Sequence, residues 1–387
     1  MTRPTARWML LALCGALIAS GSEATPVQPT RDDEVIEVLP AVKGNRAEER
    51  RLRQRLAQAP RDPALALAVA RRNLDQAHAL GDPRFAGIAL AALAPWTDEA
   101  AMPDELLLMR ATLQQYLHQF DAAAQSLQHL LARPGAARPQ AWLTLATVRR
   151  VQGRYAESDA ACAQLARAGA TIYASACAAE NAGLRGDVER ARRSFEAMLG
   201  DPRADAPTRG WLATSLAELE QRAGRERAAE AAYQAALKLA PDAYLRLAYA
   251  DFLIEQGRAS QALPLLAREA RSDAVLLRLA IAGTRAGAAS AASDVAEMRD
   301  RIAAANERPD ARVLHGREQA MFALAIDGDA PRALALARGN VTQQREALDL
   351  LVLARAARAS GDPASLREVR RVVQETGLRD QRVEALL

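Results

Sequence analysis

Small and large apolar residues return in the same order along most of the chain, at a spacing close to 34 residues. Between residues 141 and 155 the order is a tryptophan, a Leu-Ala pair, a glycine and a tyrosine: Trp142, Leu145, Ala146, Gly153 and Tyr155. Apolar positions three and four residues apart on both sides of the glycine indicate two amphipathic helices joined by a tight turn. The order recurs around three later glycines, at intervals of 33, 38 and 33 residues: Gly186, Gly224 and Gly257. A repeat of this length predicts a stack of helix hairpins.

This repeat resembles the tetratricopeptide (TPR) consensus. Trp142 stands at its fourth position, Leu145 and Ala146 at its seventh and eighth, and Gly153 in its turn. The resemblance covers most of residues 61–387 and is strongest over 103–269. It implies an all-α fold, a right-handed superhelical solenoid of about eight helix hairpins. The turn inside each hairpin is predicted at the following residues: Gly81, His118, Gly153, Gly186, Gly224, Gly257, Gly287, Gly328 and Gly361.

Other segments depart from the repeat. Residues 46–60 predict an N-terminal capping helix, whereas residues 25–45 carry prolines and charges without helical periodicity and predict a flexible lead-in. Two prolines within residues 200–207 predict a loop between hairpins. Residues 363–387 predict a closing helix pair. Within the repeats, Ala229 and Ala250 fall where two helices are expected to cross most closely, so larger side chains should not fit there.

The first 24 residues have the layout of a secretory signal peptide. Arg3 and Arg7 precede an apolar stretch from Trp8 to Ala19, and small residues follow. Twelve apolar residues are too few to span a bilayer comfortably, so we expect cleavage after Ala24 and a periplasmic or secreted chain without a transmembrane segment. Lipid anchoring through Cys14 is not favoured, because Leu13, directly before it, is bulky where a lipoprotein signal has a small residue.

Only Cys162 and Cys177 remain after such a cleavage. In an oxidising compartment, a pair of cysteines can form a disulfide. Two small buried residues that fill helix contacts are the other interpretation. The sequence does not give the distance that a bridge requires, and we expect the second interpretation.

Composition and charge limit the classes of function. Aromatic residues make up 4% of the chain and the net charge is +4. Acidic and basic residues alternate along most predicted helices, as over residues 189–196, which indicates a solvated surface rather than the gathered basic face of a nucleic-acid-binding protein. Helical repeats that bind RNA have a similar length. Their consensus differs, and export would separate this protein from RNA.

The familiar sequence signatures of enzymes do not occur in this chain. The four histidines do not form a zinc-binding pattern, and neither a nucleophile elbow nor a glycine-rich phosphate loop occurs. We therefore expect no enzyme, no cofactor and no metal site. The alternative is an exported enzyme, or a component that processes cell-envelope glycans and uses the repeats as a scaffold.

By the resemblance, the first helix of each hairpin lines a concave face. Aromatic residues recur at the second repeat position in three successive hairpins and acids recur at the ninth, which predicts a groove that holds another protein or peptide. The basic residues that clamp a carboxylate in chaperone-binding TPR proteins are replaced by Leu143, Ala176 and Thr214. The sequence thus predicts a protein-binding scaffold, a monomer or weak oligomer, whose candidate contact residues are Tyr173, Trp211, Tyr244, Glu180, Glu218, Asp251 and Arg222.

Overall fold

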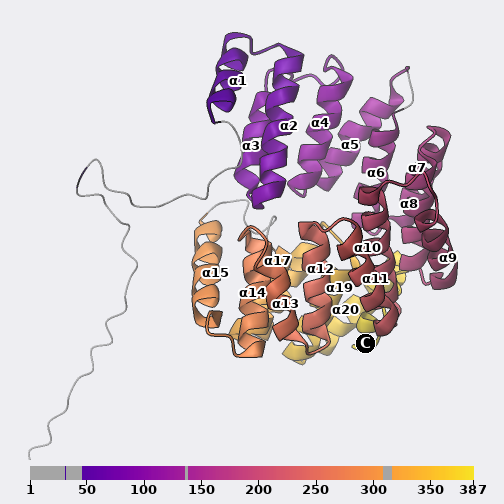
Figure 1. The fold of residues 1–387 in the computed structure, drawn as a ribbon, viewed down its shortest axis with the longest axis vertical. Helices are drawn as coiled ribbons and strands as arrows, with labels where there is room; N and C mark the ends of the chain where they lie inside the picture. Colours follow the sequence, from indigo (N-terminus) through magenta and orange to yellow (C-terminus); the bar gives the residue numbers. More distant parts are fainter. Residues whose placement is uncertain (1–30, 32–45, 136–137, 308–315) are drawn as a thin grey trace, which may run out of the picture. The chain divides into compact units, whose positions relative to one another are not determined.

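The computed structural model describes residues 31, 46–135, 138–307 and 316–387. The predicted signal peptide and lead-in, residues 1–24 and 25–45, lie outside this part apart from Arg31. Residues Arg46–Leu387 form one compact unit. Within the described part of that unit the fold is all-α, and helices follow one another along the whole length (Figure 1). The prediction of an all-α helical-repeat solenoid is confirmed.

A single helix, α1 (Arg46–Gln58), precedes a series of hairpins. The first helix of each hairpin contacts its own second helix, and in most cases also the first helix of the next hairpin. Nine hairpins lie in the described residues: α2 (Pro63–Leu80) with α3 (Pro83–Ala92), α4 (Asp104–Tyr116) with α5 (Phe120–Ala132), α6 (Pro139–Val151) with α7 (Tyr155–Arg167), α8 (Thr171–Leu184) with α9 (Val188–Leu199), α10 (Ala206–Arg222) with α11 (Glu226–Leu239), α12 (Ala243–Glu255) with α13 (Ala259–Leu266), α14 (Asp273–Ala286) with α15 (Ala291–Asn306), α17 (Gly316–Phe322) and the π-helix η1 (Ala323–Asp327) with α18 (Ala330–Val341), and α19 (Ala347–Ser360) with α20 (Pro363–Thr376). A short helix, α21 (Gln381–Glu384), closes the chain.

The turns lie where the repeat predicts them. Each predicted turn glycine has a positive φ, for example 73° at Gly153 and 69° at Gly224, and His118 is the one residue of another type with a positive φ (58°) in the described part of the chain. A single residue in the left-handed conformation ends a helix, and glycine adopts this conformation without a steric penalty. The turn assigned to His118 from spacing alone is therefore correct.

Small residues occupy the helix crossings. Ala229 and Ala250 have no exposed surface, and Ser158, at the corresponding place in an earlier hairpin, is equally buried. The Ser158 hydroxyl donates a hydrogen bond of 2.8 Å to the carbonyl oxygen of Ala146 on the facing helix. A serine can be buried there because its hydroxyl has a partner. The close approach of the two helices thus depends on the short side chain at each crossing.

Asp-Pro dipeptides begin several helices. At Asp62, Asp82 and Asp362 the carboxylate accepts backbone N–H groups of the first helical turn, and the proline that follows occupies a position where a helix needs no N–H donor. The loop predicted at residues 200–207 separates α9 from α10 but ends at Asp205, which caps α10, because Ala206 and Pro207 already belong to the first turn of that helix. These aspartates therefore act as helix caps.

Later parts of the chain contact the turns of earlier hairpins. The backbone N–H of Arg345 donates to the carbonyl oxygen of Val151, and that of Arg379 to Leu184, at 2.6 and 2.7 Å. A side chain added at Gly81 would meet Ser272, and one added at Gly224 would meet Gln381. Such contacts join segments that are far apart in sequence, so the hairpins of residues 46–387 interact beyond their immediate neighbours.

Cys162 and Cys177 form a disulfide between α7 and α8, with their Cα atoms 5.8 Å apart. The expectation of two unpaired cysteines was wrong. Both residues are buried, as that expectation required. However, the α7–α8 connection folds back so that the two side chains meet, and spacing along the sequence does not reveal this.

Candidate interaction groove and adjoining cavity

The seven predicted contact residues lie on three successive first helices. Tyr173 and Glu180 are on α8, Trp211, Glu218 and Arg222 on α10, and Tyr244 and Asp251 on α12. On each helix the aromatic residue and the acid are seven positions apart, which is two helical turns and therefore the same face. We call these seven residues the inner groove, after the concave face on which the repeat pattern predicts them.

Two of the three aromatic residues contact each other. The ring centroids of Tyr173 and Trp211 are 5.9 Å apart with an angle of 30° between the planes. Trp211 is half-buried and packs on the apolar cluster of Phe195 and Met198. Tyr173 is 42% exposed and Tyr244 is 61% exposed. The aromatic residues therefore present accessible apolar surface, with Trp211 anchored in the core.

Each acid of the inner groove already has a partner within the protein. Glu180 forms an ion pair with Arg150 on α6 and accepts a hydrogen bond of 2.9 Å from Ser215 on α10. Asp251 accepts two hydrogen bonds, of 3.0 and 2.8 Å, from Arg278 on α14, whose side chain is buried. These contacts tie neighbouring first helices together. The two carboxylates are consequently less available to a cationic ligand than the sequence suggests.

Glu218 has a different environment. It accepts a hydrogen bond of 2.6 Å from the Tyr244 hydroxyl. Burial raises the pKa of the Glu218 carboxyl above its ordinary value, Arg222 opposes this shift, and the carboxylates of Glu180 and Glu346 add to it. In turn, the charge of Glu218 raises the pKa of the Tyr244 hydroxyl well above 10. Both groups hold their protons more firmly than in water.

Arg222 completes the groove. It lies four residues, one helical turn, after Glu218 on α10. Its Nε is buried and has no hydrogen-bond partner among the described residues. Because this atom has almost no accessible surface, a ligand in the groove cannot supply the missing acceptor, and the Nε–H is an unsatisfied buried donor of the fold.

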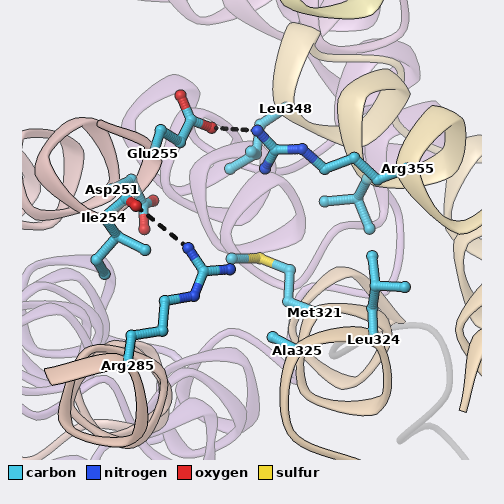
Figure 2. Close-up of a pocket in the computed structure, with 10 residues that line it drawn as sticks. Asp251, Ile254, Glu255, Arg285, Met321, Leu324, Ala325, Leu348 and Arg355 are labelled. Atoms are coloured by element: carbon cyan, nitrogen blue, oxygen red, sulfur yellow. Dashed lines mark hydrogen bonds and ion pairs between the residues drawn. The ribbon is translucent and has the colours of Figure 1, made fainter. Parts of the chain in front are cut away.

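A cavity adjoins the inner groove at Asp251. It has a volume of about 310 Å³, and its walls come from α12, α14, α17, η1 and α19 (Figure 2). The walls therefore belong to the first-helix segments of four successive hairpins. The lining residues are Asp251, Ile254, Glu255, Arg285, Met321, Leu324, Ala325, Leu348, Val352 and Arg355. The first helices of these hairpins thus surround a cavity that is partly open to solvent.

Glu255 is the centre of a polar network at the edge of this cavity. Its carboxylate accepts hydrogen bonds from Arg355 at 3.0 Å, from Arg382 at 3.1 Å and from Gln221 at 2.9 Å. Arg382 also pairs with Asp380 at 2.7 Å. Glu255 therefore links α10, α12, α19 and the C-terminal helix α21.

Sequence reasoning missed the cavity. The place of Arg285 could have been predicted from the repeat, because Arg285 stands two residues before the turn glycine Gly287, just as Glu255 stands two residues before Gly257. Arg355 does not share that position. It joins the cavity lining through its side chain, which pairs with Glu255 of α12 across 100 residues of sequence, a contact that no single repeat encodes.

No group of three or more His, Cys, Asp or Glu side chains is placed to hold a metal ion in the described residues. Within those residues, too, no helix is long and apolar enough to cross a membrane.

Comparisons with known proteins give little similarity. No protein-family model matches the chain, and no curated protein matches it. Among solved structures, a tetratricopeptide repeat protein from Parabacteroides merdae is similar, with 16% identity and a TM-score of 0.38, over 65% of this chain and 98% of that one. A TM-score below 0.5 does not establish a shared fold. The assignment of a helical repeat therefore rests on the helices and turns of this chain.

Proposed function

We propose that the protein is an exported interaction scaffold that holds a partner polypeptide in the inner groove. The observation that carries this proposal is the exposure of the groove's tyrosines. Only four large apolar residues in the described part of the chain are exposed: Ile88, Tyr173, Leu239 and Tyr244. Two of the four stand at the same repeat position on α8 and α12, on either side of Trp211. Tyrosine and tryptophan supply most of the affinity in many protein interfaces.

The contacts within the groove refine the chemistry of the partner. Because Glu180 and Asp251 are paired with arginines, attraction of a basic segment adds less to binding than a row of free acids would. A segment with apolar side chains that cover the Tyr173–Trp211 pair complements the groove better. Affinity should then depend only weakly on salt concentration, since few unpaired charges are involved.

The disulfide supports the export of the chain to an oxidising compartment. Disulfides persist in oxidising compartments and are rare in the cytosol, so the bond between Cys162 and Cys177 fits an exported chain. We propose the periplasm or the cell exterior as the site of action, with the signal peptide removed after Ala24. N-terminal sequencing of the protein recovered from a periplasmic fraction tests this. A first residue of Thr25 agrees with the proposal, and an intact N-terminus confined to the cytosol contradicts it.

The binding proposal is tested by isolating a partner from periplasmic extract, purifying it and titrating it against variants. The double variant Tyr173→Ala/Tyr244→Ala should weaken binding by more than tenfold, because both anchors are lost. The matched control is Ile88→Ala/Leu239→Ala, which removes the other two exposed apolar side chains. It should change the affinity by less than about threefold, under 1 kcal/mol. An equal effect of the two variants would place the binding surface elsewhere.

A further inference from the structure

The cavity beside the inner groove has apolar walls and a polar edge. Ile254, Met321, Leu324, Leu348 and Val352 supply hydrocarbon and thioether surface. Figure 2 shows the guanidinium groups of Arg285, from α14, and Arg355, from α19, in the same space as these side chains. Apolar walls with a few convergent polar groups are the usual composition of a small-molecule site.

The charges at the cavity are unequal. Asp251 is engaged with Arg278 through both of its oxygens. Glu255 is shared by Arg355 and Arg382, and Arg382 pairs with Asp380 as well. Arg285 donates one hydrogen bond, of 3.2 Å, to the backbone oxygen of Ile254 and has no carboxylate partner among the described residues. The acids are thus occupied, and Arg285, which is exposed to solvent, is the arginine of the cavity lining that lacks a carboxylate partner in the described part of the chain.

The backbone of one wall is irregular. Leu324 and Ala325 belong to η1, a single π-helical segment that continues α17 and ends at Gly328, where φ is 65°. π-helical turns inserted into α-helices are uncommon and frequently occur at functional sites. The repeat itself does not require one, since the other eight hairpins have α-helical first helices. This irregularity adds an observation independent of the charges.

We propose that the cavity binds a small amphipathic organic anion, with one carboxylate bound by Arg285 and an apolar body against Met321, Leu324 and Leu348. A cavity of about 150 Å³ lined by apolar side chains takes up benzene. The volume of about 310 Å³ is twice as large and suits a ligand of about ten to twelve heavy atoms. Arginine is suited to a carboxylate because two of its N–H donors match the two oxygens. The proposal does not depend on the partner polypeptide proposed above.

Octanoate, octylammonium and octan-1-ol test the proposal, because they share an apolar chain and differ in charge. Isothermal titration of the purified chain should show octanoate binding at least tenfold more tightly than either of the other two. The substitution Arg285→Gln should weaken octanoate binding at least tenfold. The control Arg358→Gln removes an exposed arginine of α19 that does not line the cavity, and it should leave binding unchanged.

A second variant separates binding from folding. Ala325 is exposed at the cavity wall, so Ala325→Trp should fill the space without disturbing the core. It should weaken octanoate binding at least tenfold and leave the melting temperature of the free protein unchanged. Equal binding of all three probes, or unaltered octanoate binding by both Arg285→Gln and Ala325→Trp, overturns the proposal. Neither result bears on the Tyr173/Tyr244 test, so the two proposals fail independently.

Discussion

The backbone N–H of Arg379 donates a hydrogen bond of 2.7 Å to the carbonyl oxygen of Leu184, the last residue of α8. The last carbonyls of a helix have no partner inside that helix. Here a residue close to the C-terminus supplies one. Arg345 does the same for Val151, the last residue of α6. The ends of these two first helices are therefore completed by segments from distant hairpins.

Leu378→Ala should destabilise the protein by about 2–4 kcal/mol, the usual cost of truncating a buried leucine. Leu378 is 1% exposed and belongs to the same apolar cluster as Leu184. Urea unfolding followed by circular dichroism measures the loss. Leu239→Ala is the control, because Leu239 is 38% exposed and should cost well under 1 kcal/mol. Equal stability of the two variants would contradict the contact between distant hairpins.

Ala250→Leu and Ala229→Leu should each cost about 1–3 kcal/mol by overpacking a helix crossing. Both alanines are fully buried. Ala235→Leu adds the same atoms at an exposed position of α11 and should leave stability unchanged. Thermal melting of the three variants checks this. Wild-type melting temperatures for Ala229→Leu and Ala250→Leu would show that the crossing tolerates a larger side chain.

Loss of the disulfide should cost about 3 kcal/mol, because the bond closes a loop of 15 residues. The comparison is between the double variant Cys162→Ala/Cys177→Ala and the wild type in urea. Peptide mapping of the unreduced chain should recover the two cysteine peptides linked to each other. Free thiols at both positions in protein taken from the periplasm would contradict the bond.

Asp349 makes stability depend on pH. Burial raises the pKa of its carboxyl to about 7, against about 3.9 in an unfolded chain. The folded state therefore binds an extra proton between these values. The resulting stabilisation is complete below about pH 4 and is lost as the pH rises through about 7.

The variant Asp349→Asn cannot take up or release this proton. The melting temperature of the variant minus that of the wild type should therefore increase between pH 5 and pH 8, because the wild type alone loses stability over this range. Asp300→Asn, on the exposed side of α15, is the control and should show a constant difference from the wild type. A constant difference for Asp349→Asn as well would mean that Asp349 stays ionised across this range.

The sequence predicted what a single repeat encodes. Gly153 and Gly224 mark turns, Ala229 marks a crossing, and even His118 was assigned correctly, because each depends on contacts within one hairpin. The partners of Glu180 and Asp251 were missed, because Arg150 and Arg278 belong to neighbouring hairpins. A charged residue at an inward position gives the same sequence pattern whether it is paired or free.

The cavity and the disulfide were missed for a related reason. Arg355 and Glu255 meet only after the later hairpins have come back to the earlier ones, and the repeat pattern carries no information about that return. Cys162 and Cys177 are on consecutive helices, but the sequence does not fix the rotation of α7 relative to α8 that brings their side chains together. Local periodicity therefore predicts hairpins well and predicts long-range contacts poorly.

The hydrogen bonds to Val151 and Leu184 also affect the order in which the protein can fold. In an ordinary repeat array each unit needs only its neighbours, so folding can spread along the chain during synthesis. Here the carbonyl groups at the ends of α6 and α8 lack these partners until residues 345 and 379 have been made. A nascent chain that stops before Arg345 would carry well-formed hairpins with unfinished helix ends, and its last residues would complete hairpins made long before them.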